Sequence, residues 1–422
     1  MDSKMRGVSS QSWLSLGCAW LLGFFMWGLT LAVSPILGEI KVDLQLTYAE
    51  AGLLFSFPII MLAALAIPGG MLADKLGIRK AAGLGALIMG VGAFLRGAST
   101  DFLTLLAFTG IYGVGWGMGV TNLPKLVSGW FPAEFSGTAT GIYSTGINTG
   151  ATLTLAMTLP VVYPLVGSWR GTLYFWGVLA LIAAALWWIL VRDPPTSDPT
   201  RHENLAHVVG VGRLWAKVWR DRNIWVVAVM LFLHNIAFYT LMGWFPTFLV
   251  LKGATAAIGA VITSIIMLVA IPTSMLFPTA SDRLRLRKPF YWAAALIYAA
   301  IFYLTLFLPW GTAWVTAFIL GVTMTSAWIL CLILPLDLAT ERHVGVATGV
   351  VISIGYVGGL VGPWVAGYVM DLSGSFDSAL YFLIIVTLIS VAVCILGLPE
   401  TGERRKNRAS PVGSNLLGGV KF

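Results

Sequence analysis

The sequence is poor in charge. Asp, Glu, Lys and Arg make up only 10% of its 422 residues, whereas 58% of the residues are hydrophobic, and the mean hydropathy is +0.86. Soluble globular domains carry about 25% charged residues, which cover the surface that faces water. A chain with so few charges cannot build such a surface, so the composition excludes an ordinary soluble fold and indicates a protein dissolved in a lipid bilayer.

Residue types that build metal sites and nucleophilic active sites are also scarce. The chain has four His and three Cys. No metal-spaced His/Cys cluster, paired carboxylates, phosphate-binding P-loop or Ser/His/Asp set stands out, so the sequence argues against an enzyme and predicts no cofactor and no metal. Cys18, Cys331 and Cys394 lie in apolar runs, and we expect them to pack as small apolar side chains without disulfides.

Twelve apolar runs are long enough to cross about 30 Å of hydrocarbon as helices. A few such runs could belong to a buried soluble core, but twelve in succession predict an all-α integral membrane protein. Their approximate limits are 13–37, 48–69, 81–97, 102–130, 137–162, 171–191, 223–249, 257–277, 289–308, 312–338, 344–370 and 375–397.

Basic residues fall almost entirely on one side of this topology. With the N-terminus in the cytoplasm, most of the 26 Lys and Arg residues lie in cytoplasmic segments, and the opposite side holds only Lys41, Arg96, Arg170 and Lys252. The asymmetry predicts that both termini are cytoplasmic and that the chain lies in the cell inner (plasma) membrane. The net charge of +8 thus comes from the basic residues that orient the chain in the membrane. We therefore expect no nucleic-acid partner.

The chain repeats itself. The string EFSGTATG at 134–141 returns as RHVGVATG at 342–349, an offset of 208 positions, and the same offset relates Gly150 to Gly358. Small residues let membrane helices approach closely, so we expect the repeated strings to mark close helix contacts. The repeat predicts two pseudo-symmetric bundles of six helices each.

Four segments follow from this repeat: a first bundle at 1–192, a cytoplasmic linker with a short amphipathic helix at 193–222, a second bundle at 223–402, and a basic cytoplasmic tail at 403–422. Two similar bundles can rock about a site at the bilayer midplane, which is typical of secondary transporters. A duplicated bundle without any substrate is the alternative.

A family resemblance lies in the loops between the runs. The segment GGMLADKLGIRK after the second run resembles the signature of the major facilitator superfamily, and TASDRLRLRK after the eighth run resembles a weaker copy. The resemblance covers nearly the whole chain and implies the major facilitator fold, with signature residues that control a gate without touching the substrate. The predicted gating residues are Gly70, Asp74, Gly77, Arg79 and Lys80, with Asp282 and Arg283 in the weaker copy.

The resemblance also implies a substrate site midway along the helices, between the two bundles. A polar side chain inside a membrane needs a partner or a water-filled cavity, so polar and aromatic residues near the middle of the runs are the candidates. They are Trp27, Asn122, Lys125, Tyr143, Asn148, His234, Asn235, Tyr239, Trp328 and Tyr356. Packing, anchoring at the membrane interface or an interhelical hydrogen bond is the alternative role for these residues.

Two of these candidates can carry charge. Lys125 is the only basic residue that we place well inside a run, where it can snorkel to the lipid headgroups or face the cavity and attract an anion. His234 can titrate near neutral pH or simply pack. The first, fourth and seventh runs have no acidic residue in their interiors. Protons are therefore a candidate coupling ion only through His234, Lys125 or the substrate's own charge.

Three stretches narrow the resemblance: GIYSTGINTGATLTLAMTLPV, SWRGTLYFWGVLAL and FYTLMGWFPTFL are similar to the cyanate and nitroimidazole permease branch, and TGINTG resembles part of nitrate and nitrite porters. Nitrate porters hold their anion with arginines in helices two and eight, but 48–69 and 257–277 contain none. The resemblance thus implies a secondary transporter, here a symporter, for a small monocarboxylate-like or cyanate-like anion. One chain of twelve helices already encloses a pathway, so we expect a monomer. The alternative is an exporter of amphipathic drugs or other small organic molecules.

Overall fold

The computed structural model describes residues 9–194, 218–284, 286–338 and 344–399, and the regular elements in these ranges are all helices. Twelve helical segments of this described part are long and apolar enough to cross a membrane, which confirms the predicted fold class. The predicted amphipathic helix of the linker falls mostly outside the described residues, and the tail at 403–422 lies wholly outside them.

Six membrane spans form the first bundle. Four of them are interrupted, because a helix ends and another begins within the same span. The elements are α1 (Ser10–Leu31) and α2 (Val33–Asp43), α3 (Tyr48–Leu76), α4 (Ile78–Leu95) with η1 (Arg96–Ala98), α5 (Phe102–Val120) and α6 (Asn122–Trp130), α7 (Ala133–Met157) with η2 (Thr158–Val162) and α8 (Tyr163–Val166), and α9 (Trp169–Leu190).

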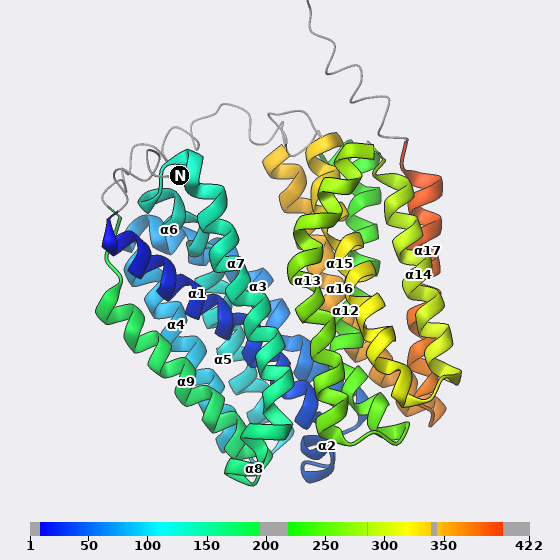
Figure 1. Ribbon diagram of the computed structural model, residues 1–422. Helices are drawn as coiled ribbons and strands as arrows, with labels where there is room; N and C mark the ends of the chain where they lie inside the picture. Colours follow the sequence, from blue (N-terminus) through cyan, green and yellow to red (C-terminus); the bar gives the residue numbers. More distant parts are fainter. Residues whose placement is uncertain (1–8, 195–217, 285, 339–343, 400–422) are drawn as a thin grey trace, which may run out of the picture.

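Six further spans form the second bundle. They are α12 (Arg222–Leu251), α13 (Ala256–Leu284), α14 (Lys288–Phe307), η3 (Trp310–Thr312) with α15 (Ala313–Leu338), α16 (Val344–Ser373) and α17 (Asp377–Gly397). Figure 1 shows the two bundles side by side, meeting near α2 and diverging toward the end at which α1 begins. We call these the α2 end and the terminal end.

Side-chain caps fix where two helices start at the α2 end. Thr47 and Glu50 form a capping box at the start of α3, in which each side chain accepts a hydrogen bond from the other's backbone N–H. Asp101 accepts the Thr104 N–H at 3.0 Å at the start of α5. This backbone hydrogen bond holds the pKa of Asp101 below its usual range. The caps let the chain reverse direction in very short loops.

The predicted repeat is visible in the helix packing. A Cβ atom added to Gly150 would collide with the carbonyl oxygen of Phe24, so the backbones of α7 and α1 touch. A Cβ atom added to Gly358 would collide in the same way with the carbonyl oxygen of Phe232, where α16 meets α12. Both residue pairs are related by the offset of 208, so the two bundles repeat one backbone contact as well as one order of helices.

A neighbouring contact repeats with the roles of its two partners exchanged. In the first bundle Gly23 of α1 faces the Ile147 side chain of α7, whereas in the second bundle the Leu231 side chain of α12 faces Gly355 of α16. The offset of 208 relates Gly23 to Leu231 and Ile147 to Gly355. Each bundle therefore places one glycine and one branched side chain at this contact, but on opposite helices.

Three glycines of the repeated strings make no close contacts. A Cβ atom at Gly137, Gly141 or Gly349 would have no atom within 4 Å, so the prediction of close helix approach was wrong for these glycines. The close approach occurs farther along the same helices, at Gly146 and Gly150 in α7. A small residue permits close packing only where its face of the helix meets a neighbour.

These glycines provide a matched test of the packing. Gly150→Ala and Gly358→Ala should each destabilise the protein by about 1–3 kcal/mol, because the new methyl group overpacks a backbone contact. Gly141→Ala and Gly349→Ala should be neutral or stabilising by up to about 1 kcal/mol, because alanine favours a helix. Thermal unfolding of the purified proteins in detergent measures the difference, and equal melting temperatures for all four variants would contradict the packing account.

Candidate functional site

The two bundles touch backbone to backbone at the α2 end. A Cβ atom at Gly52 of α3 would collide with the carbonyl oxygen of Pro363 in α16, and one at Gly367 of α16 would collide with the carbonyl oxygen of Tyr48. Glycine is required at both positions because any side chain would separate the two helices. This contact brings the start of α3 against the end of α16.

The Asp371 carboxylate of α16 adds hydrogen bonds to this contact with α3. Its two carboxylate oxygens accept the backbone N–H groups of Tyr48 and Ala49, each at 2.9 Å. These N–H groups belong to the first turn of α3, where the helix leaves donors unpaired and its dipole favours a negative charge. Nearby, the Ser34 hydroxyl of α2 donates to the Met242 carbonyl at 2.6 Å. We call the first arrangement the Asp371 cap; it joins the bundles through helix ends.

A central aromatic cluster joins the bundles farther from the α2 end. It consists of Trp27 from α1, Trp116 from α5, Phe238 and Tyr239 from α12, and Tyr356 from α16. The Trp27 ring centroid lies 5.3 Å from those of Trp116 and Tyr239 and 6.5 Å from that of Phe238, and Tyr239 lies 6.5 Å from Tyr356. Trp27 and Tyr356 are only partly buried and pack against the hydrophobic cores of both bundles.

This cluster brings together three of the predicted substrate residues, Trp27, Tyr239 and Tyr356. Neither tyrosine hydroxyl makes a hydrogen bond with another residue in the described part of the chain. Such a group inside a membrane protein needs water or a ligand as its partner. The cluster therefore offers aromatic faces and unpaired hydroxyl groups at the junction of the two bundles.

Two further predicted residues lie on α12 beside the cluster. His234 is 1% exposed, its ring stacks on Phe238 at 6.3 Å, and neither of its nitrogens has a hydrogen-bond partner within the described ranges. Asn235 donates to the Gly355 carbonyl of α16 at 2.9 Å, while its own oxygen is buried without a partner there. Asn235 thus makes an interhelical hydrogen bond, which is the role that we considered as the alternative to substrate binding. Its side-chain oxygen can still accept a hydrogen bond.

Sequence reasoning missed Trp116 and Tyr112, although α5 carries a signal for them. Gly113 and Gly115 pack against the backbones of α3 and α4, respectively. The large residues Tyr112 and Trp116 are four positions apart and therefore share the remaining face of α5. Their rings stack at 6.0 Å, and the Tyr112 hydroxyl lies 2.7 Å from the Thr30 hydroxyl of α1. Glycines on two faces of α5 therefore predict that its large side chains lie on the third face.

Sequence reasoning also misjudged Arg96. We placed it near the end of the run 81–97, on the side opposite the cytoplasm, and did not consider it for the site, but Arg96 is 1% exposed and its side chain lies inside the first bundle. Its guanidinium donates to the Leu29 carbonyl at 3.1 Å and lies 4.8 Å from the centre of the Tyr112 ring. Arg96 is thus a buried basic side chain of the first bundle, although it stands near the end of its span.

The terminal end holds the predicted gating residues and also Lys125. The Lys125 ammonium group lies 2.5 Å from an Asp74 carboxylate oxygen and donates to the Gly70 carbonyl at 2.8 Å. The structure therefore brings Lys125 together with the gating residues and not with the central aromatic cluster. The Asp74 and Lys125 side chains are both partly exposed, so the pair contributes at most about 1 kcal/mol to stability.

Asp193 completes this gate region, although the sequence placed it in the linker. Its carboxylate accepts the Arg79 backbone N–H at 2.8 Å and lies against Gly77, which has φ of +88°. A side chain at Gly77 would be strained by that backbone conformation and would meet the carboxylate. The Arg79 guanidinium donates to the Trp188 carbonyl of α9 at 2.6 Å, so these contacts tie the loop between α3 and α4 to the end of α9.

The second bundle has a comparable ion pair at the same end. Arg287, which the offset of 208 relates to Arg79, donates to Asp337 at 3.0 Å and to Ser281 at 3.0 Å. The Arg287 side chain is almost fully buried. Both this pair and the Asp74–Lys125 pair lie within a single bundle, whereas the Asp371 cap joins the two.

The remaining predicted residues lie apart from the cluster. Asn122 is buried and donates to the Met118 carbonyl at 2.7 Å, at the junction of α5 and α6. Tyr143 packs in the core of the first bundle, and Asn148 is partly buried in α7. Trp328 is 36% exposed on α15. Lys80 and Arg283 are exposed, and the side chain of Asp282 lies outside the described residues.

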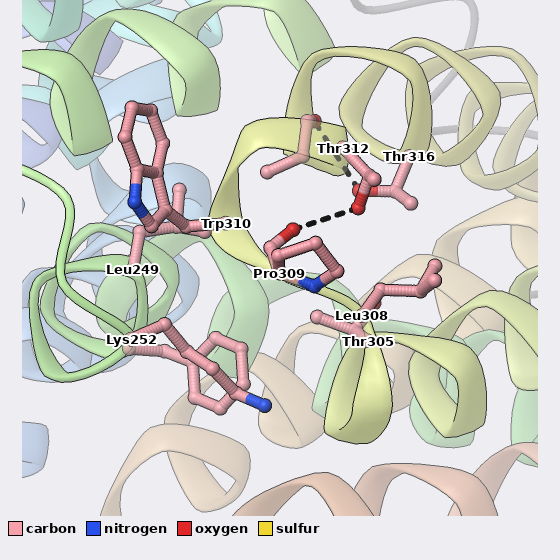
Figure 2. Close-up of a pocket in the computed structure, with 10 residues that line it drawn as sticks. Leu249, Lys252, Thr305, Leu308, Pro309, Trp310, Thr312 and Thr316 are labelled. Atoms are coloured by element: carbon pink, nitrogen blue, oxygen red, sulfur yellow. Dashed lines mark hydrogen bonds between the residues drawn. The ribbon is translucent and has the colours of Figure 1, made fainter.

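Two cavities at the α2 end differ from the cluster in character. Figure 2 shows one near Lys252 and Trp310, with a volume of about 10 Å³, which is room for about one water molecule. The other is a groove of about 570 Å³ whose only charged lining residues are Glu39 and Asp43. The first is too small for an organic substrate, and the second presents two carboxylates, of which Asp43 is paired with Arg170 at 2.7 Å.

Comparison with known proteins gives the family. The model of the Major Facilitator Superfamily matches residues 18–360 and 253–421. Among solved structures, a bacterial homolog to the human lysosomal transporter Spinster, in an inward-facing and unoccupied conformation, has a TM-score of 0.80 at 16% identity, and the match covers 96% of this chain and 100% of that one. This structural likeness supports the fold alone.

Three curated relatives match nearly full-length. The cyanate transport protein CynX of Escherichia coli (strain K12) is 25% identical, over 88% of this chain and 94% of its own. The 2-nitroimidazole transporter of the same organism is 25% identical, over 90% and 94%. The probable sulfoacetate transporter SauU of Cupriavidus necator is 27% identical, over 89% and 91%. The predicted resemblance to the cyanate and nitroimidazole branch is confirmed.

Two tryptophans test the central cluster. Trp27→Ala should weaken binding of a small-molecule ligand that the wild type binds by about tenfold or more, because buried Trp contacts commonly contribute about 2 kcal/mol or more. Trp328→Ala should change binding by less than about twofold, because Trp328 lies outside the cluster. Isothermal titration calorimetry on monodisperse protein measures both, and a larger effect at Trp328 than at Trp27 would place the site elsewhere.

Proposed function

The chain belongs to the Major Facilitator Superfamily, and we propose that it carries a small organic anion across the plasma membrane as a secondary transporter, by alternating access. The observation that supports this most is the central aromatic cluster. It lies where the two bundles meet, its members come from four helices of both bundles, and two of its hydroxyl groups are unpaired. A ligand bound there would touch both bundles and could favour one arrangement of them over another.

The two ends of the protein support alternating access. At the α2 end the Asp371 cap and the glycine contacts hold α3 against α16. At the terminal end the ion pairs of Asp74 and Asp337 each stay within one bundle. The distribution of basic residues predicts that the terminal end is cytoplasmic. This arrangement corresponds to a protein that is closed to the outside.

An anionic substrate agrees with the charges near the cluster. No carboxylate is among the described residues that contact Trp27 or Tyr239 through their rings. Two full-length relatives are named for anions, cyanate and sulfoacetate. Lys125 is engaged by Asp74, so we assign it to the terminal-end gate, where exchange of its partner would accompany the movement of the bundles.

The second candidate function is export of amphipathic drugs or other small organic molecules. The aromatic character of the cluster favours it, since Trp27, Trp116 and Phe238 would bind a flat apolar ring, and one relative is named for 2-nitroimidazole. The two functions differ in substrate charge. An anion carrier discriminates against neutral analogues of the same size, whereas a drug exporter does not.

Uptake by proteoliposomes tests the proposed function. Vesicles that contain the full-length protein should accumulate labelled cyanate, sulfoacetate or lactate faster than protein-free vesicles do, and an inward proton gradient should raise the rate if protons are coupled. Transport that is confined to neutral or cationic aromatic compounds would refute the anion proposal and favour the exporter. If His234 carries the proton, His234→Gln should abolish the response to the gradient while leaving exchange of the anion intact.

A labelling experiment tests the Asp371 cap. Asp371→Ala should expose the interface at the α2 end, because the first turn of α3 loses its carboxylate acceptor. In a Ser34→Cys background, a thiol reagent that cannot cross the membrane should then react at least about fivefold faster, which corresponds to about 1 kcal/mol. The native cysteines are buried.

Asp377→Ala is the matched control for this experiment. Asp377 lies at the same end, in the first turn of α17, but makes no contact across the two bundles in the hydrogen bonds of the described residues. This variant should leave the labelling rate of Ser34→Cys unchanged. Equal rates for Asp371→Ala and the parent protein would show that the cap does not hold the α2 end closed.

A further inference from the structure

We propose that Arg96 is the fixed positive charge that makes the central aromatic cluster select anions, and that it acts through Tyr112 and Trp116 without touching the substrate. This inference rests on the proposed function and names the residue that sets the charge preference of the same site. Arg96 is therefore a positioning residue whose contribution is electrostatic.

The charge of Arg96 has no acidic partner among the residues that the structure describes. One guanidinium nitrogen donates to the Leu29 carbonyl, the group lies over the Tyr112 ring, and Nε is buried without a partner. Burying a cation inside a membrane protein is costly, and such residues usually pair with an acid or serve a function. A neutral side chain would avoid this cost, so the retained charge needs an explanation.

A continuous path of ring contacts leads from this charge to the junction of the bundles. The guanidinium lies 4.8 Å from the centre of the Tyr112 ring, Tyr112 stacks on Trp116 at 6.0 Å, and Trp116 contacts Trp27 at 5.3 Å. The Tyr112 hydroxyl is held by Thr30 and by the Met26 carbonyl, both of α1. The ring is therefore fixed between the charge and the cluster.

Water is excluded along this path, because Arg96, Tyr112 and Trp116 are all almost completely buried. With an effective dielectric constant of about 20, a unit charge about 10 to 15 Å from a bound ion changes its affinity about five- to fifteenfold. The same charge leaves a neutral ligand nearly unaffected. An unpaired Arg96 therefore favours a bound anion, and the cluster contributes shape and apolar contact.

A purely structural role is the rival explanation. Leu29 lies near the end of α1, where the helix is interrupted before α2, and the guanidinium could simply hold this carbonyl. That role predicts equal losses for charged and neutral ligands when Arg96 is changed, together with a lower melting temperature. Selectivity between an acid and its amide separates the two explanations, because both ligands need the same folded site.

The first test compares lactate with lactamide and acetate with acetamide, in binding and in uptake by proteoliposomes. The wild type should prefer the anion. Arg96→Gln should lower affinity for the anion about tenfold and change affinity for the amide less than about twofold, whereas Arg96→Lys should keep most of the preference. Parallel losses for anion and amide in Arg96→Gln would overturn the proposal in favour of the structural role.

A second pair of variants keeps Arg96 in place, so the test does not depend on folding of Arg96→Gln. Thr30 lies beside Tyr112 and next to Leu29 in the chain. Thr30→Asp would supply the missing negative charge, and Thr30→Asn is a neutral control of the same size. Thr30→Asp should reduce the preference for the anion about tenfold relative to Thr30→Asn. Equal preference in these two variants would also overturn the proposal.

Failure of the proposed function gives a different result. If wild-type protein binds and transports none of the acids but does transport neutral aromatic compounds, the anion proposal itself is wrong. If the wild type prefers acids to amides and Arg96→Gln and Thr30→Asp retain that preference, the transporter proposal stands and the role of Arg96 is refuted.

Discussion

Direct contact between helix backbones is the constraint on which the rest of this structure depends. Lipid chains are as apolar as the side chains they surround, so helices in a bilayer associate through close packing and hydrogen bonds. At Gly150 and Gly358 the helices of each bundle touch without any intervening side chain. These contacts fix α1 on α7 and α12 on α16, and they thereby fix where Trp27 and Tyr356 project.

The polar interactions are divided between the two ends and the middle of the protein. Carboxylates at the terminal end pair with cations of their own bundle, whereas Asp371 at the α2 end pairs with a helix start of the other bundle. Between them lie aromatic rings with unpaired hydroxyl groups and one buried cation, Arg96. The Asp371 cap is thus made by exposed groups that water can solvate, whereas the cation Arg96 is buried.

The fold could be predicted from the sequence because it depends on the length of the apolar runs and on the internal repeat. Apolar runs of bilayer length predict the spans, and the offset of 208 predicts the two bundles. The site was harder, because these helices are apolar on all sides, so no periodic pattern tells which face meets a neighbour and which meets lipid. Gly141 was therefore mistaken for a contact, Lys125 was considered for the substrate cavity, and Arg96 was counted only as a basic residue on the side opposite the cytoplasm.

The exchanged partners at Gly23–Ile147 and Leu231–Gly355 have a consequence for how the two halves can change over time. In each half the pair consists of one glycine and one branched side chain. The branched side chain stands on α7 in the first half and on α12 in the second. A first-half helix transplanted into the second half would set glycine against glycine or a branched chain against a branched chain. The two partners of each half are thus matched to each other, so a larger residue at Gly23 or Gly355 is best accommodated together with a smaller residue at its partner position.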